Sequence, residues 1–258
     1  MRPYLAGFNR GLRGAVVAPG DLTVRMTFLV IVVLVMAALW SAAVEANGGS
    51  IEGYTRDSLL WYVMAAQVAV IAVRPRTVEE VGEEIGSGTV AVQMLLPVSV
   101  AGLRMSIEAG EAAARLAAAL VVGGAATWML AGPPPSAAGL AMAVPACALG
   151  AAANIASQHA FGGIAFWLLD AKSTWFVYQK LVFIPGGMLI PLELLPGGLE
   201  AVARVLPFAT MAYVPGRLAS GHAEPELLAW QAAWLVALVG VALAVYAAGQ
   251  RRLEVLGG

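Results

Sequence analysis

Long uncharged, apolar stretches alternate along the chain with short segments in which the charged residues gather. Three of these stretches contain 19, 16 and 24 consecutive residues without a charge. A helix needs about 20 apolar residues to cross the hydrocarbon core of a bilayer, within a range of about 17 to 25. The three stretches therefore predict membrane spans at about 26–45, 58–73 and 227–249, the second of them short.

A fourth stretch contains 54 uncharged residues and is interrupted once, at 132–136, by the sequence Gly-Pro-Pro-Pro-Ser. Three consecutive prolines end a helix because each has a fixed φ and lacks an N–H donor. This stretch therefore predicts a tight hairpin of two spans, at about 112–131 and 137–160.

The last candidate span, 173–192, is long enough to cross but contains Lys180 and Pro185. With it, the pattern predicts six spans in a single transmembrane domain, 1–258. Composition agrees, since 60% of the residues are hydrophobic, 12% are charged and the mean hydropathy is +0.80. We therefore expect an all-α integral membrane protein, a six-helix bundle.

The basic residues are divided unevenly between the two sides that six spans define. With the N-terminus in the cytosol, eleven of them fall on the inner side and three on the outer side, as the positive-inside rule requires. Both termini are therefore expected in the cytosol. The inner set is Arg2, Arg10, Arg13, Arg25, Arg74, Arg76, Arg104, Arg115, Lys172, Arg251 and Arg252, and the outer set is Arg56, Arg204 and Arg217.

The first cytosolic loop is predicted to form an amphipathic helix at about 77–86. Thr77 and Glu80 have the spacing of a capping box, in which each side chain satisfies a backbone N–H at the start of the helix. The helix places its acidic residues on one side and apolar residues on the other. It is either a solvated loop helix or a docking surface for a cytosolic partner, and the docking residues would be Arg76, Glu79, Glu80, Glu83 and Glu84.

Four charges follow at the base of the third span, in two pairs with i, i+4 spacing: Arg104 with Glu108, and Glu111 with Arg115. Such pairs neutralise charge on a helix that is about to enter lipid. We interpret them as stem charges, because a proton or ion relay should lie deeper in the membrane.

The fourth span is longer than a bilayer requires and contains Asn154, Gln158 and His159. Polar side chains at that depth usually form hydrogen bonds to another helix. We therefore expect these residues, and Gln67 in the second span, to hold helices together or to line a substrate path. No second ligand stands at metal-binding spacing, so no metal site is predicted.

Prolines and glycines break the segment at about 193–225, which remains rich in apolar residues. Apolar pieces too short to span predict short helices that dip part-way into the outer leaflet. The segment is either a structural lid or an external gate. The candidate gate residues lie in this segment and just before it, and they are Pro185, Pro191, Pro207, Phe208, Tyr213 and Pro215.

The motifs of catalysis are missing from this sequence. It contains no G-x-x-x-x-G-K-[ST] phosphate-binding loop, no H-E-x-x-H zinc motif and no G-x-S-x-G nucleophile elbow. The net charge of −1 gives no basic excess to attract nucleic acid. We expect a chain that is not an enzyme on its own and binds no cofactor itself.

The order of these elements resembles the permease subunit of type-2 ATP-binding-cassette exporters, over nearly the whole chain. Several short motifs, in order and at the right spacing, carry the resemblance to a bacterial branch of that family. They are Glu84-Ile85-x-x-Gly88-Thr89, Leu95-Leu96-Pro97, Phe166-Trp167-Leu168-Leu169-Asp170, Ile190-Pro191-Leu192, Leu206-Pro207-Phe208, Tyr213-Val214-Pro215-Gly216 and Arg251-Arg252-Leu253. A basic residue often precedes the loop proline in that family, whereas Leu96 stands here.

The resemblance implies half of a pump in a bacterial inner membrane. Two such permeases, identical or related, would face each other, and two separate ATPase subunits would bind ATP and Mg beneath them. The helix from Thr77 would be the coupling helix, and the stretch from Arg2 to Asp21 an interfacial helix beside it. The substrate would be a hydrophobic or amphipathic molecule, such as a drug, lipid or glycolipid.

Two other functions remain open at this point. An ion-coupled carrier or channel would need a buried ionisable group, for which His159 and Lys180 are the candidates. A membrane scaffold without transport activity would need neither nucleotide nor substrate.

Overall fold

The structure is a computed structural model that describes residues 2–17, 19–93, 98–168 and 171–257. Within these ranges the chain is almost entirely helical and has no strand, only an isolated bridge between Ile51 and Tyr54. Two pieces of the sequence motifs, Leu95-Leu96-Pro97 and Leu169-Asp170, lie outside the described residues. The all-α prediction is confirmed for the part of the chain that the structure describes.

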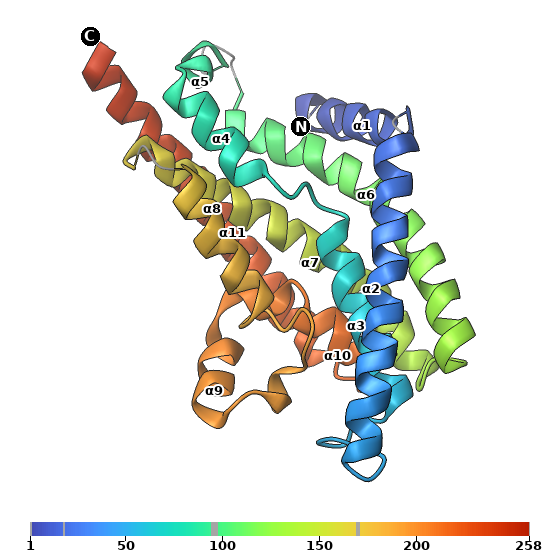
Figure 1. The fold of residues 1–258 in the computed structure, drawn as a ribbon. Helices are drawn as coiled ribbons and strands as arrows, with labels where there is room; N and C mark the ends of the chain where they lie inside the picture. The colour runs from blue at the N-terminus through green and yellow to red at the C-terminus, as the bar shows by residue number, and fades with distance from the viewer. Residues whose placement is uncertain (1, 18, 94–97, 169–170, 258) are drawn as a thin grey trace.

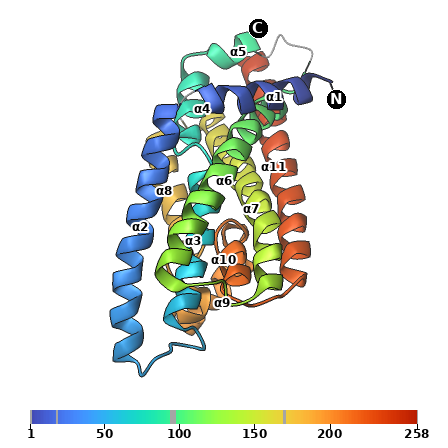
Figure 2. The same cartoon turned by 90° about the vertical axis from the view of Figure 1, so that its right-hand side faces the viewer.

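Four of the described helices are long and apolar enough to cross a membrane. They run along the length of the bundle in Figure 2 and correspond to the predicted first, third, fourth and sixth spans. They are α2 (Pro19–Ala46), α6 (Val100–Ala131), α7 (Ala137–Gly163, continued by the 3-10 turn η1, Ile164–Phe166) and α11 (Glu226–Gly257).

The expectation of six spanning helices is not confirmed, because the second and fifth candidates are short. Helix α3 (Arg56–Ile71) has 16 residues and α8 (Ala171–Phe183) has 13, against the roughly 20 that a full crossing needs. Nearly every residue of α3 is buried, because α2, α6, α7 and α10 surround it. Helix α8 ends shortly before Pro185, and Gly187 then adopts a φ of +70° that turns the chain.

Two of the long helices differ from their predicted outlines. Helix α6 begins at Val100 rather than near 112, because the Ser99 side chain caps it by accepting a hydrogen bond from the Gly102 N–H. Helix α7 runs to Gly163 rather than ending near 160. Its Gly162-Gly163 pair allows close packing. A Cβ at Gly162 would lie 2.8 Å from the Val81 side chain, and a Cβ at Gly163 would lie 2.6 Å from the Val245 side chain. The pair therefore brings α4 and α11 close to α7.

Helices α1 (Arg2–Val17), α4 (Thr77–Gly86) and α5 (Thr89–Gln93) gather at one end of the bundle, near both termini, and α1 lies across that end (Figures 1 and 2). We call this the inner end. Helix α9 lies at the opposite, outer end (Figure 1). The predicted outer segment consists of short helices: η2 (Leu192–Leu194), α9 (Gly197–Val205), η3 (Pro207–Thr210) and α10 (Tyr213–Ala219).

Candidate functional site

Helix α4, at the predicted position of the coupling helix, is fastened to the bundle by its apolar face. Val78, Val81 and Ile85 are buried on that face, at 0%, 1% and 8% exposure. They pack toward α7, η1 and α8. The apolar side of the predicted amphipathic helix therefore faces neighbouring helices of the same chain and packs α4 against the inner ends of α7 and α8.

The predicted capping box at the start of α4 is wrong. The helix is capped by Arg76, which makes no side-chain capping bond, and Thr77 is the first helical residue. The Thr77 hydroxyl instead donates to Oε2 of Glu108 on α6, at 3.3 Å. The Thr77 hydroxyl therefore binds a carboxylate of another helix instead of the backbone N–H that the capping-box spacing predicts.

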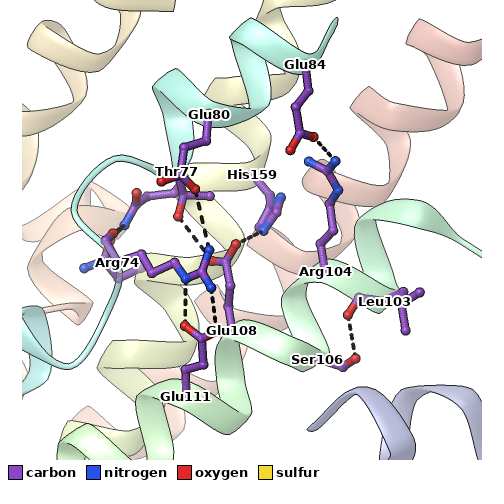
Figure 3. Close-up of polar contacts among 12 residues, drawn as sticks. Arg74, Thr77, Glu80, Glu84, Leu103, Arg104, Ser106, Glu108, Glu111 and His159 are labelled. Atoms are coloured by element: carbon purple, nitrogen blue, oxygen red, sulfur yellow. Dashed lines mark hydrogen bonds and ion pairs between the residues drawn. The ribbon is translucent and has the colours of Figure 1, made fainter. Parts of the chain in front are cut away.

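The four glutamates of α4 do not form one acidic stripe. Glu80 and Glu84 turn toward the bundle, where Glu80 lies 3.6 Å from Arg74 and Glu84 pairs with Arg104 (Figure 3). Glu79 pairs with Arg76 at 2.7 Å, and this hydrogen bond raises the pKa of the exposed Arg76 guanidinium. Glu83 is exposed and makes no ion pair within the described residues. The accessible charges of α4 are therefore Arg76, Glu80 and Glu83, because the Glu79 side chain is only 13% exposed whereas that of Glu80 is 52% exposed.

A buried polar network lies directly beneath α4. Nε2 of His159, on α7, is 3.1 Å from Oε1 of Glu108, and its Nδ1 is 3.3 Å from the Tyr246 hydroxyl on α11. With the bond from Thr77, this network joins four helices (Figure 3 shows Thr77, Glu108 and His159). We call Thr77, Glu108, His159 and Tyr246 the inner network. Its histidine is fully buried, so a shift of α4 reaches α7 and α11 through hydrogen bonds.

A second set of charges holds the segment before α4. Arg74 donates two hydrogen bonds to Glu111 of α6, at 2.7 and 2.5 Å, and these bonds raise the pKa of the guanidinium. Arg115 lies 3.3 Å from Glu111, so that predicted pair is present. The other predicted pair is wrong: Arg104 binds Glu84 and Gln93, whereas Glu108 binds His159.

A cavity of about 350 Å³, lined in part by charged side chains, lies between α4 and α6 beside these contacts. Its walls come from α1, α4, α5, α6 and the segment before α4, and they include Arg10, Arg74, Glu80, Glu84, Arg104 and Glu108. The contacts between α4 and α6 are thus polar and border a cavity, while those between α4 and α7 are apolar and close. Movement of α4 relative to α6 costs less packing than movement relative to α7.

The other polar residues of α7 bind neighbouring segments, which is one of the two roles that the sequence left open. The Gln158 amide donates to Asn154 Oδ1 at 3.1 Å and to the Arg74 carbonyl at 3.0 Å. The Tyr178 hydroxyl of α8 donates to the same Oδ1 at 2.5 Å. Gln67 is buried on α3 at 4% exposure. Asn154 and Gln158 therefore connect α7 to α8 and to the loop before α4.

The outer end is held by a carboxylate that the sequence analysis did not identify. Oε1 of Glu193 accepts hydrogen bonds from Tyr213 at 2.5 Å and from Arg204 at 2.9 Å, and it lies 3.5 Å from Arg217. Oε2 accepts from Tyr54 at 3.2 Å. Burial alone raises the pKa of Glu193, but the Tyr213 hydrogen bond and the two guanidinium groups bring it below its ordinary value. We call these five residues the outer cluster.

The candidate gate residues do not lie together. Tyr213 belongs to the outer cluster, and Phe208 packs with Phe161 and Tyr178, with ring centroids 6.1 and 6.3 Å away. Pro185, Pro191 and Pro215 are buried and Pro207 is half-buried. Lys180 is exposed on α8 and lies 5.0 Å over the Phe176 ring. Of the two candidates for a buried ionisable group, only His159 is buried in this chain.

The comparisons agree with this architecture. A search of curated proteins found no match. The family model of the ABC-2 family transporter protein matches residues 24–257, which includes all four spanning helices except the start of α2, together with α4 and the outer segment. The chain therefore belongs to the ABC-2 family of transporter proteins, as an integral membrane permease.

Proposed function

We propose that this permease exports a hydrophobic or amphipathic substrate, such as a drug, lipid or glycolipid, using ATP hydrolysis by a separate ATPase subunit. The family supports an ATPase partner. In this proposal, two ATPase subunits bind ATP and Mg beneath two permeases, identical or related, in a bacterial inner membrane. The inner end, with both termini, faces the cytosol, and the outer segment opens to release the substrate.

The observation that carries this proposal is that α4 binds the bundle with one side and exposes charged residues on the other. Arg76 and Glu83 are exposed on its outward side, where a partner can bind. On its inward side, Thr77 and Glu84 contact α6, Glu80 contacts Arg74 in the preceding segment, and the buried apolar face packs against α7. A loop helix that is merely solvated has no need of inward ion pairs, whereas a helix that transmits movement does.

Site-directed cross-linking tests the docking. The native thiol, Cys147, is fully buried, so a cysteine introduced on the surface supplies the reactive group. With an ATPase partner co-expressed, Glu83→Cys should cross-link to the ATPase. Glu45→Cys, exposed at the opposite end of α2, should not. Equal cross-linking at both positions, or none at Glu83, would contradict the docking of α4.

A second function, ion-coupled transport, is favoured by one observation, the buried Glu108–His159 pair. A carrier of this kind moves substrate in response to a proton gradient without ATP. Proteoliposomes that contain the permease alone separate the two: the exporter proposal expects no gradient-driven uptake, and the carrier proposal expects uptake that a protonophore abolishes.

A further inference from the structure

Helix α1 is held against α6 by a face of small residues. Gly7, Gly11 and Ala15 are buried on this face. A Cβ at Gly11 would overlap the Ile107 carbonyl, and one at Gly110 on α6 would overlap the Phe8 carbonyl. The two backbones are therefore in direct contact, and α1 cannot rotate about its own axis without breaking that contact.

Because α1 cannot rotate, its contact with α6 determines which of its residues face away from the bundle. Leu5, Phe8, Leu12 and Val16 recur every three or four residues and form an apolar stripe along one side. Leu5 and Val16 are 64% and 67% exposed. No described helix covers this stripe at either end, and it lies at the end of a bundle whose long helices cross the membrane.

A basic stripe runs beside the apolar one. Arg2, Asn9 and Arg13 share a face of the helix and are all exposed. Helix α1 contains no acidic residue, and neither Arg2 nor Arg13 makes an ion pair within the described part of the chain. A helix with adjacent apolar and basic faces lies in the plane of a membrane interface, with its basic residues at the level of the headgroups.

We propose that α1 binds anionic phospholipid headgroups of the cytosolic leaflet through Arg2 and Arg13. The anionic surface of that leaflet attracts basic residues beside it. Eleven residues separate the two arginines along the helix, about 16 Å at 1.5 Å per residue, so each arginine binds a different headgroup. The inference rests on the proposed orientation, with the inner end in the cytosol, and is independent of the ATPase.

The packing gives this binding a consequence for the inner network. Because the backbone of α1 contacts that of α6 at Ile107 and Gly110, headgroups that fix α1 also fix the part of α6 that carries Glu108 and Glu111. Anionic lipid therefore stabilises the position from which α6 holds α4 and Arg74.

Lipid retention by the purified full chain tests the proposal. The chain is placed in nanodiscs of phosphatidylcholine and phosphatidylglycerol, and the lipid that stays bound after mild detergent extraction is quantified. The wild-type chain should enrich phosphatidylglycerol. The single variants Arg2→Gln and Arg13→Gln should each lower the enrichment about fivefold. This factor corresponds to the roughly 1 kcal/mol that one basic residue contributes near an anionic surface.

The control removes the same charge elsewhere at the inner end. Arg251→Gln with Arg252→Gln, both exposed near the end of α11, should leave the enrichment unchanged. Thermal unfolding in phosphatidylcholine alone should be the same for all three proteins, and added phosphatidylglycerol should stabilise only the wild-type chain and the control. Wild-type enrichment in the Arg2/Arg13 double variant, or an equal loss in the control, would overturn the proposal.

Discussion

His159 and Glu108 form a buried pair in which the histidine Nε2 lies 3.1 Å from the glutamate Oε1. The histidine is fully buried, and the glutamate is 9% exposed. Their other polar atoms face Tyr246 on α11 and Thr77 on α4. The pair thus stands where the candidate coupling helix meets two helices that continue into the membrane.

Removing one member of this pair should destabilise the permease strongly. His159→Leu leaves the Glu108 carboxyl group buried without its main partner, and a buried polar group left unsatisfied costs about 1–3 kcal/mol. Thermal unfolding of the purified chain measures the loss for His159→Leu, for Glu108→Leu and for the double variant. The double variant should lose less than the sum of the two single losses, because it leaves neither side chain of the pair without its partner. If the double variant loses the sum of the two single effects, the residues do not interact.

The contact between α1 and α6 predicts opposite results for two glycines of the same helix. Gly11→Ala should destabilise by about 1–3 kcal/mol, the usual cost of overpacking, because its Cβ would overlap the Ile107 carbonyl. Gly14→Ala should be neutral or stabilising by up to about 1 kcal/mol, since no described residue comes within 4 Å of the position that its Cβ would take. Thermal unfolding compares the two, and equal effects would show that α1 is not packed against α6.

The outer cluster should loosen in acid. The pKa of Glu193 is below its ordinary value of 4.5 in the folded chain, so its contribution to stability is fully present above about pH 4.5 and is lost as the pH falls through the folded pKa. The protection of residues 193–217 against hydrogen exchange, corrected for the intrinsic pH dependence of amide exchange, should therefore decrease as the pH falls below 4.5.

The matched variant for this cluster is Tyr213→Phe, which removes a 2.5 Å hydrogen bond to Glu193 but keeps the ring. The loss of that bond should raise the pKa of Glu193 and move the acid transition to higher pH. Phe176→Leu on α8, which does not contact the cluster, should leave the transition in place. An unchanged transition in Tyr213→Phe would mean that Glu193 does not control the outer segment.

Much of the framework could be predicted because membrane spans and local helices depend on nearby residues. The uncharged stretches gave the four long helices, and the alternation of glutamate with valine and isoleucine gave α4 at 77–86. The shortness of α8 was harder to foresee, since Ser173–Leu192 has spanning length and only Pro185 and Gly187 indicate where it stops.

The interactions between distant residues could not be predicted from local spacing. The i, i+4 rule paired Arg104 with Glu108, but Glu84 and His159, which are far away in sequence, are their actual partners. Tyr54 and Glu193 of the outer cluster are 139 residues apart. One signal for the outer cluster was present in the sequence: Arg204 and Arg217 are predicted on the outer side of the membrane, where basic residues are few.

ATP hydrolysis by the assembled complex tests most directly whether α4 couples the permease to an ATPase. The rate is measured for the co-expressed ATPase alone, with the wild-type permease, and with Arg76→Glu/Glu83→Lys, which reverses two exposed charges on the outward surface of α4. Glu45→Lys/Glu52→Lys reverses two exposed charges at the outer end and serves as the control. The wild-type and control permeases should change the rate equally, and the α4 variant should leave it at the value of the ATPase alone. A wild-type rate with the α4 variant would contradict the coupling role of α4.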